Sequence, residues 1–263
     1  MGLSSEDRKE EFTEEELEAY FEAAEHEEPY IPFWQSQKLK RYLAVIVVVM
    51  LSASALAYVP QVFSLAAIRF LTTSAQLSQD EHVQVYKQAV VTVNADDRKG
   101  TGFLVSEAGW IVTNEHVVGD VAQCEIIFQD GGSYRAKVMI TDANTDLAIL
   151  SMGATDREVL PLMQTTSNFI GESVYIIGNP LVFNGIANEG EIWRLLDGQK
   201  SGVMAVKAPI YRGNSGSPVI RKRDGVVVGV IYATTSILDN GANQRVGLAV
   251  PSSEVHELMS KLK

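Results

Sequence analysis

The sequence predicts a mostly β globular domain that begins near residue 81 and continues through 263. Short runs rich in β-branched residues recur along this segment, for example at 89–93, 110–113 and 226–231. Glycine, asparagine or aspartate interrupts these runs about every ten residues, which is the spacing of a β-sandwich or a β-barrel. Few stretches are typical of helices, and the clearest is 253–261 near the C-terminus. We therefore expect an all-β fold that ends in a helix.

An acidic segment, residues 1–37, precedes this domain. It contains twelve acidic and two basic residues, so it carries −10 of the total formal charge of −11. Thr13 and Glu16 have the spacing of a helix-capping box, which predicts a short helix. A solvated and partly disordered tail is the alternative. A helix here would be suited to docking on a cytoplasmic partner, and the nearly neutral remainder of the chain argues against binding of nucleic acid.

An uncharged apolar run covers residues 42–59. As a helix it is roughly 27 Å long, which is just enough to cross the hydrocarbon core of a bilayer. Lys38, Lys40 and Arg41 stand before the run, and the positive-inside rule therefore places the N-terminus in the cytoplasm. The sequence predicts a single-pass signal anchor at 38–60 in the cytoplasmic membrane, in contact with lipid, and an extracytoplasmic C-terminal domain.

A cleavable signal peptide is the main alternative to an anchor. Ala55, Leu56 and Ala57 form a small-x-small processing site. The acidic segment before the apolar run is, however, much longer than the basic leader of an ordinary signal peptide. The sequence thus favours the anchor, followed by a juxtamembrane spacer at 61–80 that is partly an amphipathic helix.

Two polar residues mark the ends of strand-like runs in the first half of the domain. His116 follows the run 111–113 at a turn, and Asp146 stands directly before the apolar run 147–150. A buried carboxylate is costly unless a donor meets it, and an imidazole N–H is such a donor. Each residue alone is more often structural, and together they suggest a histidine and carboxylate pair.

A candidate nucleophile, Ser215, lies in a glycine-rich run. The run reads Gly213, Asn214, Ser215, Gly216. A serine hydroxyl attacks well only when a base removes its proton and an oxyanion hole stabilises the tetrahedral intermediate. Glycines on both sides let the backbone aim N–H groups at one point, although the same pattern also occurs in ordinary turns.

The domain shows no pattern of metal ligands or of an organic cofactor site. Cys124 is the single cysteine, so no intramolecular disulfide forms. It stands in an apolar strand-like run, where we expect it to be a small buried side chain. We therefore expect neither a metal nor a cofactor.

Taken in order, these segments resemble the trypsin-like serine proteases, most closely the bacterial HtrA/DegP group. The resemblance covers the chain from about residue 83 to its end. It rests on six short matches, at 100–105, 111–118, 145–150, 178–180, 212–218 and 246–251. It implies two six-stranded antiparallel barrels with the active site between them, the first at about 83–157 and the second at about 158–252.

The resemblance also implies a role for each candidate residue. His116 would be the general base and then the general acid, and Asp146 would orient its imidazole. Ser215 would be the nucleophile, and the N–H groups of Gly213 and Ser215 would form the oxyanion hole. The implied function is a membrane-anchored endopeptidase that hydrolyses extracytoplasmic proteins, with a homotrimer as the implied assembly. A catalytically inactive scaffold, acting as a sensor or binding module, is the alternative.

Three residues depart from the pattern of the family. Ser217 stands where a second glycine is usual. Glu115 precedes His116, where it either raises the pKa of the imidazole or faces solvent. Asn214 replaces the aspartate that pairs with a freed N-terminal amine in trypsin-type enzymes, so activation by cleavage is not expected. We also expect no C-terminal PDZ domain.

Two segments are expected to line the pocket for the residue before the scissile bond, the P1 residue. The six pocket residues predicted in them are Pro209, Ile210, Tyr211, Ile231, Tyr232 and Ala233. Neither segment contains an acidic residue, which argues against a preference for arginine or lysine. A small or medium apolar P1 residue is the expectation.

Overall fold

The computed structural model describes most of the chain, in two compact units, 1–62 and 63–263. The described residues are 13–25, 37–62, 65–164, 169–180, 183–196, 202–239 and 241–262.

The first unit contains helices α1 (Glu14–Glu25) and α2 (Gln37–Val62). The capping box predicted for α1 is confirmed, because the backbone N–H and the hydroxyl of Thr13 each donate to Glu16 Oε2 at 3.0 Å. The Glu16 N–H in turn donates to Thr13 Oγ1 at 3.4 Å. These bonds satisfy groups at the helix start that have no partner within the helix.

Helix α2 contains the apolar run 42–59. Among the described residues, no helix combines the length and the apolar character that a bilayer crossing requires. The membrane anchor predicted at 38–60, with its lipid contact, therefore has no support from the structure.

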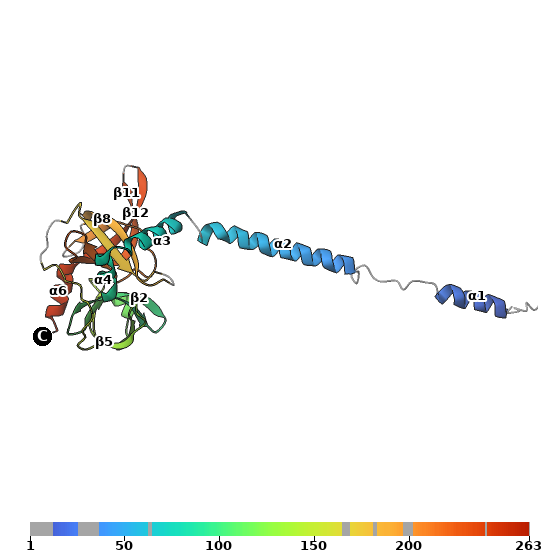
Figure 1. The fold of residues 1–263 in the computed structure, drawn as a ribbon, viewed down its shortest axis with the longest axis horizontal. Coiled ribbons are helices and arrows are strands. Elements are labelled where there is room, and N and C mark those ends of the chain that lie inside the picture. The colour runs from blue at the N-terminus through green and yellow to red at the C-terminus, as the bar shows by residue number, and fades with distance from the viewer. Residues whose placement is uncertain are drawn as a thin grey trace, which may run out of the picture. The chain divides into compact units, whose positions relative to one another are not determined.

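The second unit contains two closed antiparallel barrels of six strands each, which confirms the predicted all-β fold (Figure 1). The strand order is β1-β2-β3-β6-β5-β4 in the first barrel and β10-β11-β12-β9-β8-β7 in the second. The first barrel consists of β1 (Val90–Ala95), β2 (Arg98–Ser106), β3 (Trp110–Thr113), β4 (Gln123–Ile127), β5 (Ser133–Asp142) and β6 (Leu147–Ser151). The second consists of β7 (Ser173–Gly178), β8 (Ile186–Leu196), β9 (Val203–Lys207), β10 (Pro218–Arg221), β11 (Val227–Asp239) and β12 (Ala242–Pro251).

The strands follow the burial that their sequences predict. In β4, Cys124 and Ile126 are buried, whereas the alternating residues Gln123 and Glu125 are exposed, which is the period of two of a strand with one face toward solvent. In β6 the four residues from Leu147 to Leu150 are all fully buried. Burial of the three larger side chains, Leu147, Ile149 and Leu150, is worth about 1.5–3 kcal/mol each and fixes β6 beside the candidate site.

In the described part of this unit, four helices accompany the barrels: α3 (Leu65–Leu77), α4 (Glu81–Ala89), α5 (Glu115–Val118) and α6 (Ser252–Ser260). Helix α3 lies in the segment expected to be a spacer, but it packs on the second barrel. The ring of Phe70 meets Tyr211 edge to face, with centroids 4.5 Å apart, and Ser74 Oγ accepts a 3.1 Å hydrogen bond from the Ala187 N–H. Phe70 and Ser74 are both buried by this packing, so α3 is part of the folded domain.

Candidate active site

The histidine and aspartate of the candidate site meet because β3 pairs with β6. Thr113 at the end of β3 lies opposite Ala148 at the start of β6. The residues just after β3 and just before β6 are therefore neighbours. His116 lies in α5, and its Nδ1 is 2.7 Å from Asp146 Oδ2. The His116 backbone N–H also donates to Asp146 Oδ1 at 3.0 Å, so one carboxylate holds both the ring and the backbone of this residue.

Asp146 is itself held in an uncommon backbone conformation. Its φ is +53°, in the left-handed region that few residues other than glycine adopt. The fully buried Asn114 stabilises it, because Asn114 Nδ2 donates to the Asp146 carbonyl oxygen at 2.7 Å. Such strain is found where surrounding contacts impose it, and it is common at functional sites.

The hydrogen bond with Asp146 raises the pKa of His116 above its ordinary value of 6.5. Partial burial of the ring and the charge of Arg98 act in the opposite direction, while the charges of Asp146 and Glu115 add to the increase. Of the two expectations for Glu115, an increase in the pKa of the imidazole is thus the one that the structure supports. Because Nδ1 faces the carboxylate, Nε2 is the nitrogen left to exchange a proton.

The turn that carries Ser215 is fixed by Thr101 of the first barrel. The Thr101 N–H donates to the Ser215 carbonyl at 2.8 Å, and its hydroxyl donates to the Gly213 carbonyl at 2.7 Å. The same hydroxyl accepts from the Asn179 N–H at 2.9 Å. Gly216, with φ +84°, approaches so closely that a Cβ there would lie 1.9 Å from the Thr101 carbonyl oxygen. The turn of Ser215 is therefore held by contacts from both barrels.

Two N–H groups of this turn remain without a protein acceptor. The N–H groups of the other two residues are hydrogen-bonded. The Asn214 N–H donates to the Tyr211 carbonyl at 3.1 Å, and the Gly216 N–H donates to the Ile231 carbonyl at 2.7 Å. Among the described residues, neither the Gly213 N–H nor the Ser215 N–H donates a hydrogen bond. These are the two donors expected to form the oxyanion hole.

Ser215 and His116 are the expected nucleophile and base. Within the described part of the chain, no hydrogen bond joins Ser215 Oγ to His116 Nε2. Such bonds are often long in the absence of substrate and tighten when it binds. The structure thus contains the bond between His116 and Asp146, and it holds the turn of Ser215 against Thr101 of the first barrel.

Ser217, the departure from the family pattern two residues after Ser215, is fully buried. A Cβ at Gly178 would lie only 2.2 Å from Ser217 Oγ and 2.6 Å from Asn214 Oδ1. The serine at 217 is therefore accommodated by a glycine on β7. Its hydroxyl has no hydrogen-bond partner among the described residues.

The predicted pocket residues separate into two groups. A cavity of about 370 Å³ is lined by Lys207, Ala208, Pro209, Ile210, Tyr211, Gln244 and Arg245, and thus includes the first three predicted residues. Ile231, Tyr232 and Ala233 do not line it. Ile231 is 1% exposed and belongs to the core of the second barrel. Burial, and to a lesser extent the charge of Asp146, raise the pKa of Tyr232.

Gln244 and Arg245 were missed by the sequence analysis. They lie on β12, more than thirty residues after Tyr211, and no local motif marks them. Their place beside the cavity follows from the pairing of β12 with β9, in which Gly247 lies opposite Val206. A prediction of strand order would have been needed to find them.

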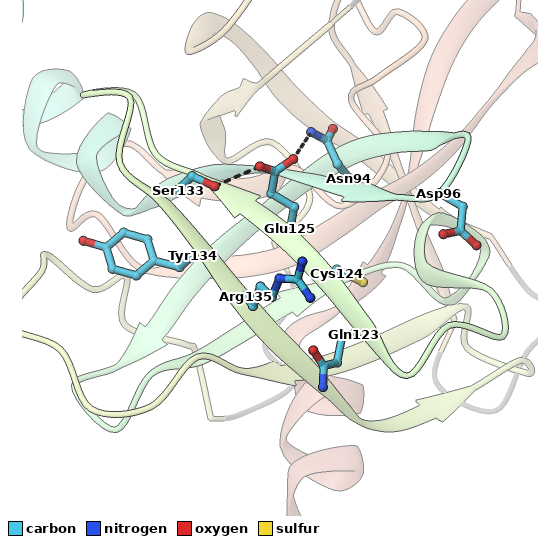
Figure 2. Close-up of a pocket in the computed structure, with 8 residues that line it drawn as sticks. All are labelled: Asn94, Asp96, Gln123, Cys124, Glu125, Ser133, Tyr134 and Arg135. Atoms are coloured by element: carbon cyan, nitrogen blue, oxygen red, sulfur yellow. Dashed lines mark hydrogen bonds between the residues drawn. The ribbon is translucent and has the colours of Figure 1, made fainter.

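A second, larger hollow of about 640 Å³ lies on the first barrel and contains none of the predicted site residues (Figure 2). Glu125 accepts hydrogen bonds there from Asn94 and Ser133, at 3.2 and 2.9 Å. Cys124 is buried beside it, as expected, and burial raises the pKa of its thiol to about 11. In the described segments, no group of three potential ligands is placed to hold a metal ion.

Residues 100–230 match the family model of the trypsin-like peptidase domain. This segment of the chain is thus similar to a trypsin-like peptidase domain. It contains His116, Asp146 and Ser215 together with both halves of the interface that fixes the turn of Ser215. The comparisons support a serine protease hydrolase.

The relatives of this domain are DegP-like. A probable periplasmic serine endoprotease of Chlamydia muridarum is 34% identical over 172 residues, which cover 64% of this chain and 34% of the relative. The corresponding protein of Brucella suis is 30% identical over 170 residues, which cover 62% of this chain and 33% of the relative. The chain thus spans about a third of the length of these curated relatives.

Solved structures show the same architecture. A serine endoprotease from Yersinia pestis matches with a TM-score of 0.59 and 29% identity, over 69% of this chain and 65% of that one. An inactive mutant of a Mycobacterium tuberculosis protein matches with a TM-score of 0.60 and 23% identity, over 71% of this chain and 92% of that one. At this lower identity the second match shows the fold alone.

Proposed function

We propose that this chain is a serine endopeptidase in which His116, Asp146 and Ser215 form the catalytic triad. The observation that carries the proposal is the double hydrogen bond of Asp146, at 2.7 Å to His116 Nδ1 and 3.0 Å to the His116 N–H. It fixes the ring with Nε2 free to act as a base. A structural histidine would not need its ring and backbone held by the same carboxylate.

The reaction proceeds by two acyl transfers. Ser215 Oγ attacks the carbonyl carbon of the substrate, and the hydroxyl proton passes to His116 Nε2. The charge on the former carbonyl oxygen is met by the N–H groups of Gly213 and Ser215, which donate to no described protein group. The protonated His116 then gives its proton to the leaving amine as the C–N bond breaks. Water, deprotonated by His116, hydrolyses the acyl-enzyme in the same way.

We infer that the substrates are proteins outside the cytoplasm. The names of the DegP-like relatives describe periplasmic endoproteases. No cofactor is required by this mechanism, because the general base, the nucleophile and the oxyanion donors all come from the chain. Assembly as a trimer and docking of the acidic α1 segment on a partner stay predictions.

One observation favours the inactive scaffold as a second candidate. The described residues include no hydrogen bond between Ser215 and His116, and that bond must form in a productive complex. Labelling with a serine-reactive phosphonate separates the two candidates. An active enzyme is labelled and loses labelling in Ser215→Ala and in His116→Ala. An inactive scaffold folds but is not labelled.

The matched controls are Ser133→Ala and His82→Ala, which remove the same side chains at exposed positions outside the site. Both controls are expected to label as the wild type does. Ser215→Ala is expected to lower kcat by up to about 10⁶-fold. Undiminished labelling of Ser215→Ala would refute the assignment of the nucleophile.

A further inference from the structure

The cavity before the nucleophile turn is lined by two cations and no carboxylate. Lys207 and Arg245 are the charged members of its lining, and Pro209, Ile210 and Tyr211 form its less polar part. The cavity adjoins the oxyanion turn directly, because the Tyr211 carbonyl accepts the 3.1 Å hydrogen bond from the Asn214 N–H. Under the proposed function, a substrate side chain placed here would be that of the P1 residue.

The two cations differ in the contacts that they already make within the protein. Lys207 Nζ lies 3.7 Å from Asp239 Oδ2 and 4.0 Å from the ring centroid of Trp193. Arg245 is exposed, and within the described segments it makes no hydrogen bond, ion pair or ring contact. Its guanidinium is therefore the charge that is available to a ligand.

The floor of the cavity is set by Ile210, which is only 6% exposed. It packs against the backbone of β12 so closely that a Cβ at Gly247 would lie 2.8 Å from Ile210 Cγ1. Arg245 precedes this glycine by two residues on the same strand, opposite Ser236 of β11. The cavity thus combines a closed apolar base with a cationic rim.

We propose that this cavity selects an acidic P1 side chain, glutamate or aspartate, and that Arg245 is the residue that determines this specificity. The proposal rests on the proposed function and replaces the apolar P1 residue expected from the sequence. The methylene groups of a glutamate would contact Ile210 and Pro209. Its carboxylate would lie at the rim, where the planar guanidinium can donate two parallel hydrogen bonds.

The size of the effect follows from the exposure of Arg245. An ion pair at a solvent-exposed site changes an equilibrium by no more than about fivefold. We therefore expect a P1 glutamate to be preferred over the neutral glutamine by up to about fivefold in kcat/KM. Salt screens such a pair, so the preference should shrink as ionic strength rises.

The test uses the full chain and peptidyl phosphonates that differ only at P1, which carries glutamate, glutamine, leucine or lysine. The second-order rate constant of labelling is measured for the wild type, Arg245→Gln and Arg245→Glu. We expect the glutamate-to-glutamine ratio to fall to about one in Arg245→Gln and lysine to become the preferred residue in Arg245→Glu. Arg135→Gln, which removes an exposed arginine from β5 of the other barrel, should leave the ratio unchanged.

The possible results separate the two proposals. Labelling by all four probes with a glutamate-to-glutamine ratio of one, or a ratio that Arg245→Gln does not alter, overturns the assignment of Arg245 and leaves the proposed protease intact. Absence of labelling by every probe overturns the proposed protease itself, and the specificity falls with it. A lower labelling rate of Arg245→Gln that is equal for all probes would show a structural role only.

Discussion

Replacement of Thr101 by valine should damage both the stability of the domain and the nucleophile turn. The hydroxyl donates to the Gly213 carbonyl at 2.7 Å and accepts from the Asn179 N–H at 2.9 Å. Valine keeps the shape of the side chain and leaves both groups without a partner. Loss of the hydrogen bond to the buried Asn179 N–H should lower the free energy of unfolding by about 1–3 kcal/mol. Loss of the bond to the partly buried Gly213 carbonyl should lower it by less, for a total of roughly 2–4 kcal/mol.

The free energy of unfolding should be measured by urea titration of the full chain, with Thr101→Ser as the control. Serine keeps the hydroxyl and loses one methyl group, which is worth about 1 kcal/mol. We also expect kcat of Thr101→Val to fall by roughly tenfold. Complete loss of an oxyanion donor lowers kcat by about 10²–10³-fold. In Thr101→Val the donor is still present, but the turn that positions it is held less firmly. Equal stability and equal kcat in the two variants would refute the view that this hydroxyl couples the barrels.

Two further predictions concern the base and the turn. Because the hydrogen bond with Asp146 raises the pKa of His116 and the base must be neutral, kcat/KM should rise with pH through a midpoint above 6.5. Asp146→Asn should move this midpoint to lower pH and reduce the plateau by about 10⁴-fold, as judged from a pH-rate profile; a midpoint that moves upward would contradict the reasoning. Gly216→Ala should cost at least about 3 kcal/mol in urea unfolding, because the new Cβ meets the Thr101 carbonyl oxygen at 1.9 Å. Gly131→Ala has nearly the same φ, +86° against +84°, with open space around it, so a loss as large as that of Gly216→Ala would show that backbone strain alone is responsible.

Much of the fold and of the candidate site could be predicted from local sequence. Strand runs such as 147–150 are marked by their continuous apolar residues, and the capping box at Thr13 by its spacing. His116 and Asp146 could be singled out because each stands at the end of such a run. The local pattern of apolar residues identifies a strand or helix, and the polar residues at its end, without knowledge of the elements that pack beside it.

The remainder depends on contacts between distant segments. The sequence predicts Ile231 and Tyr232 in one pocket, but the pairing of β11 with β12 is irregular between Ile231 and Ala233. An irregularity of this kind re-aims a side chain, and Ile231 lies in the barrel core. Arg245 comes to the cavity through the register of β12 with β9, which no local pattern encodes. The role of Thr101 also requires the second barrel, because two of its three partners at the turn lie more than one hundred residues later.

The docking of α3 on the second barrel sets the smallest fragment that should retain activity. A fragment that began at residue 81, where the strand pattern starts, would remove Phe70 from Tyr211 and leave the Ala187 N–H without Ser74. Tyr211 provides the carbonyl that holds the Asn214 N–H, one residue from the nucleophile. Proteolytic cleavage within α3 should therefore disturb the turn of Ser215, although the two segments are more than one hundred residues apart in sequence. A recombinant protease domain should begin before Phe70.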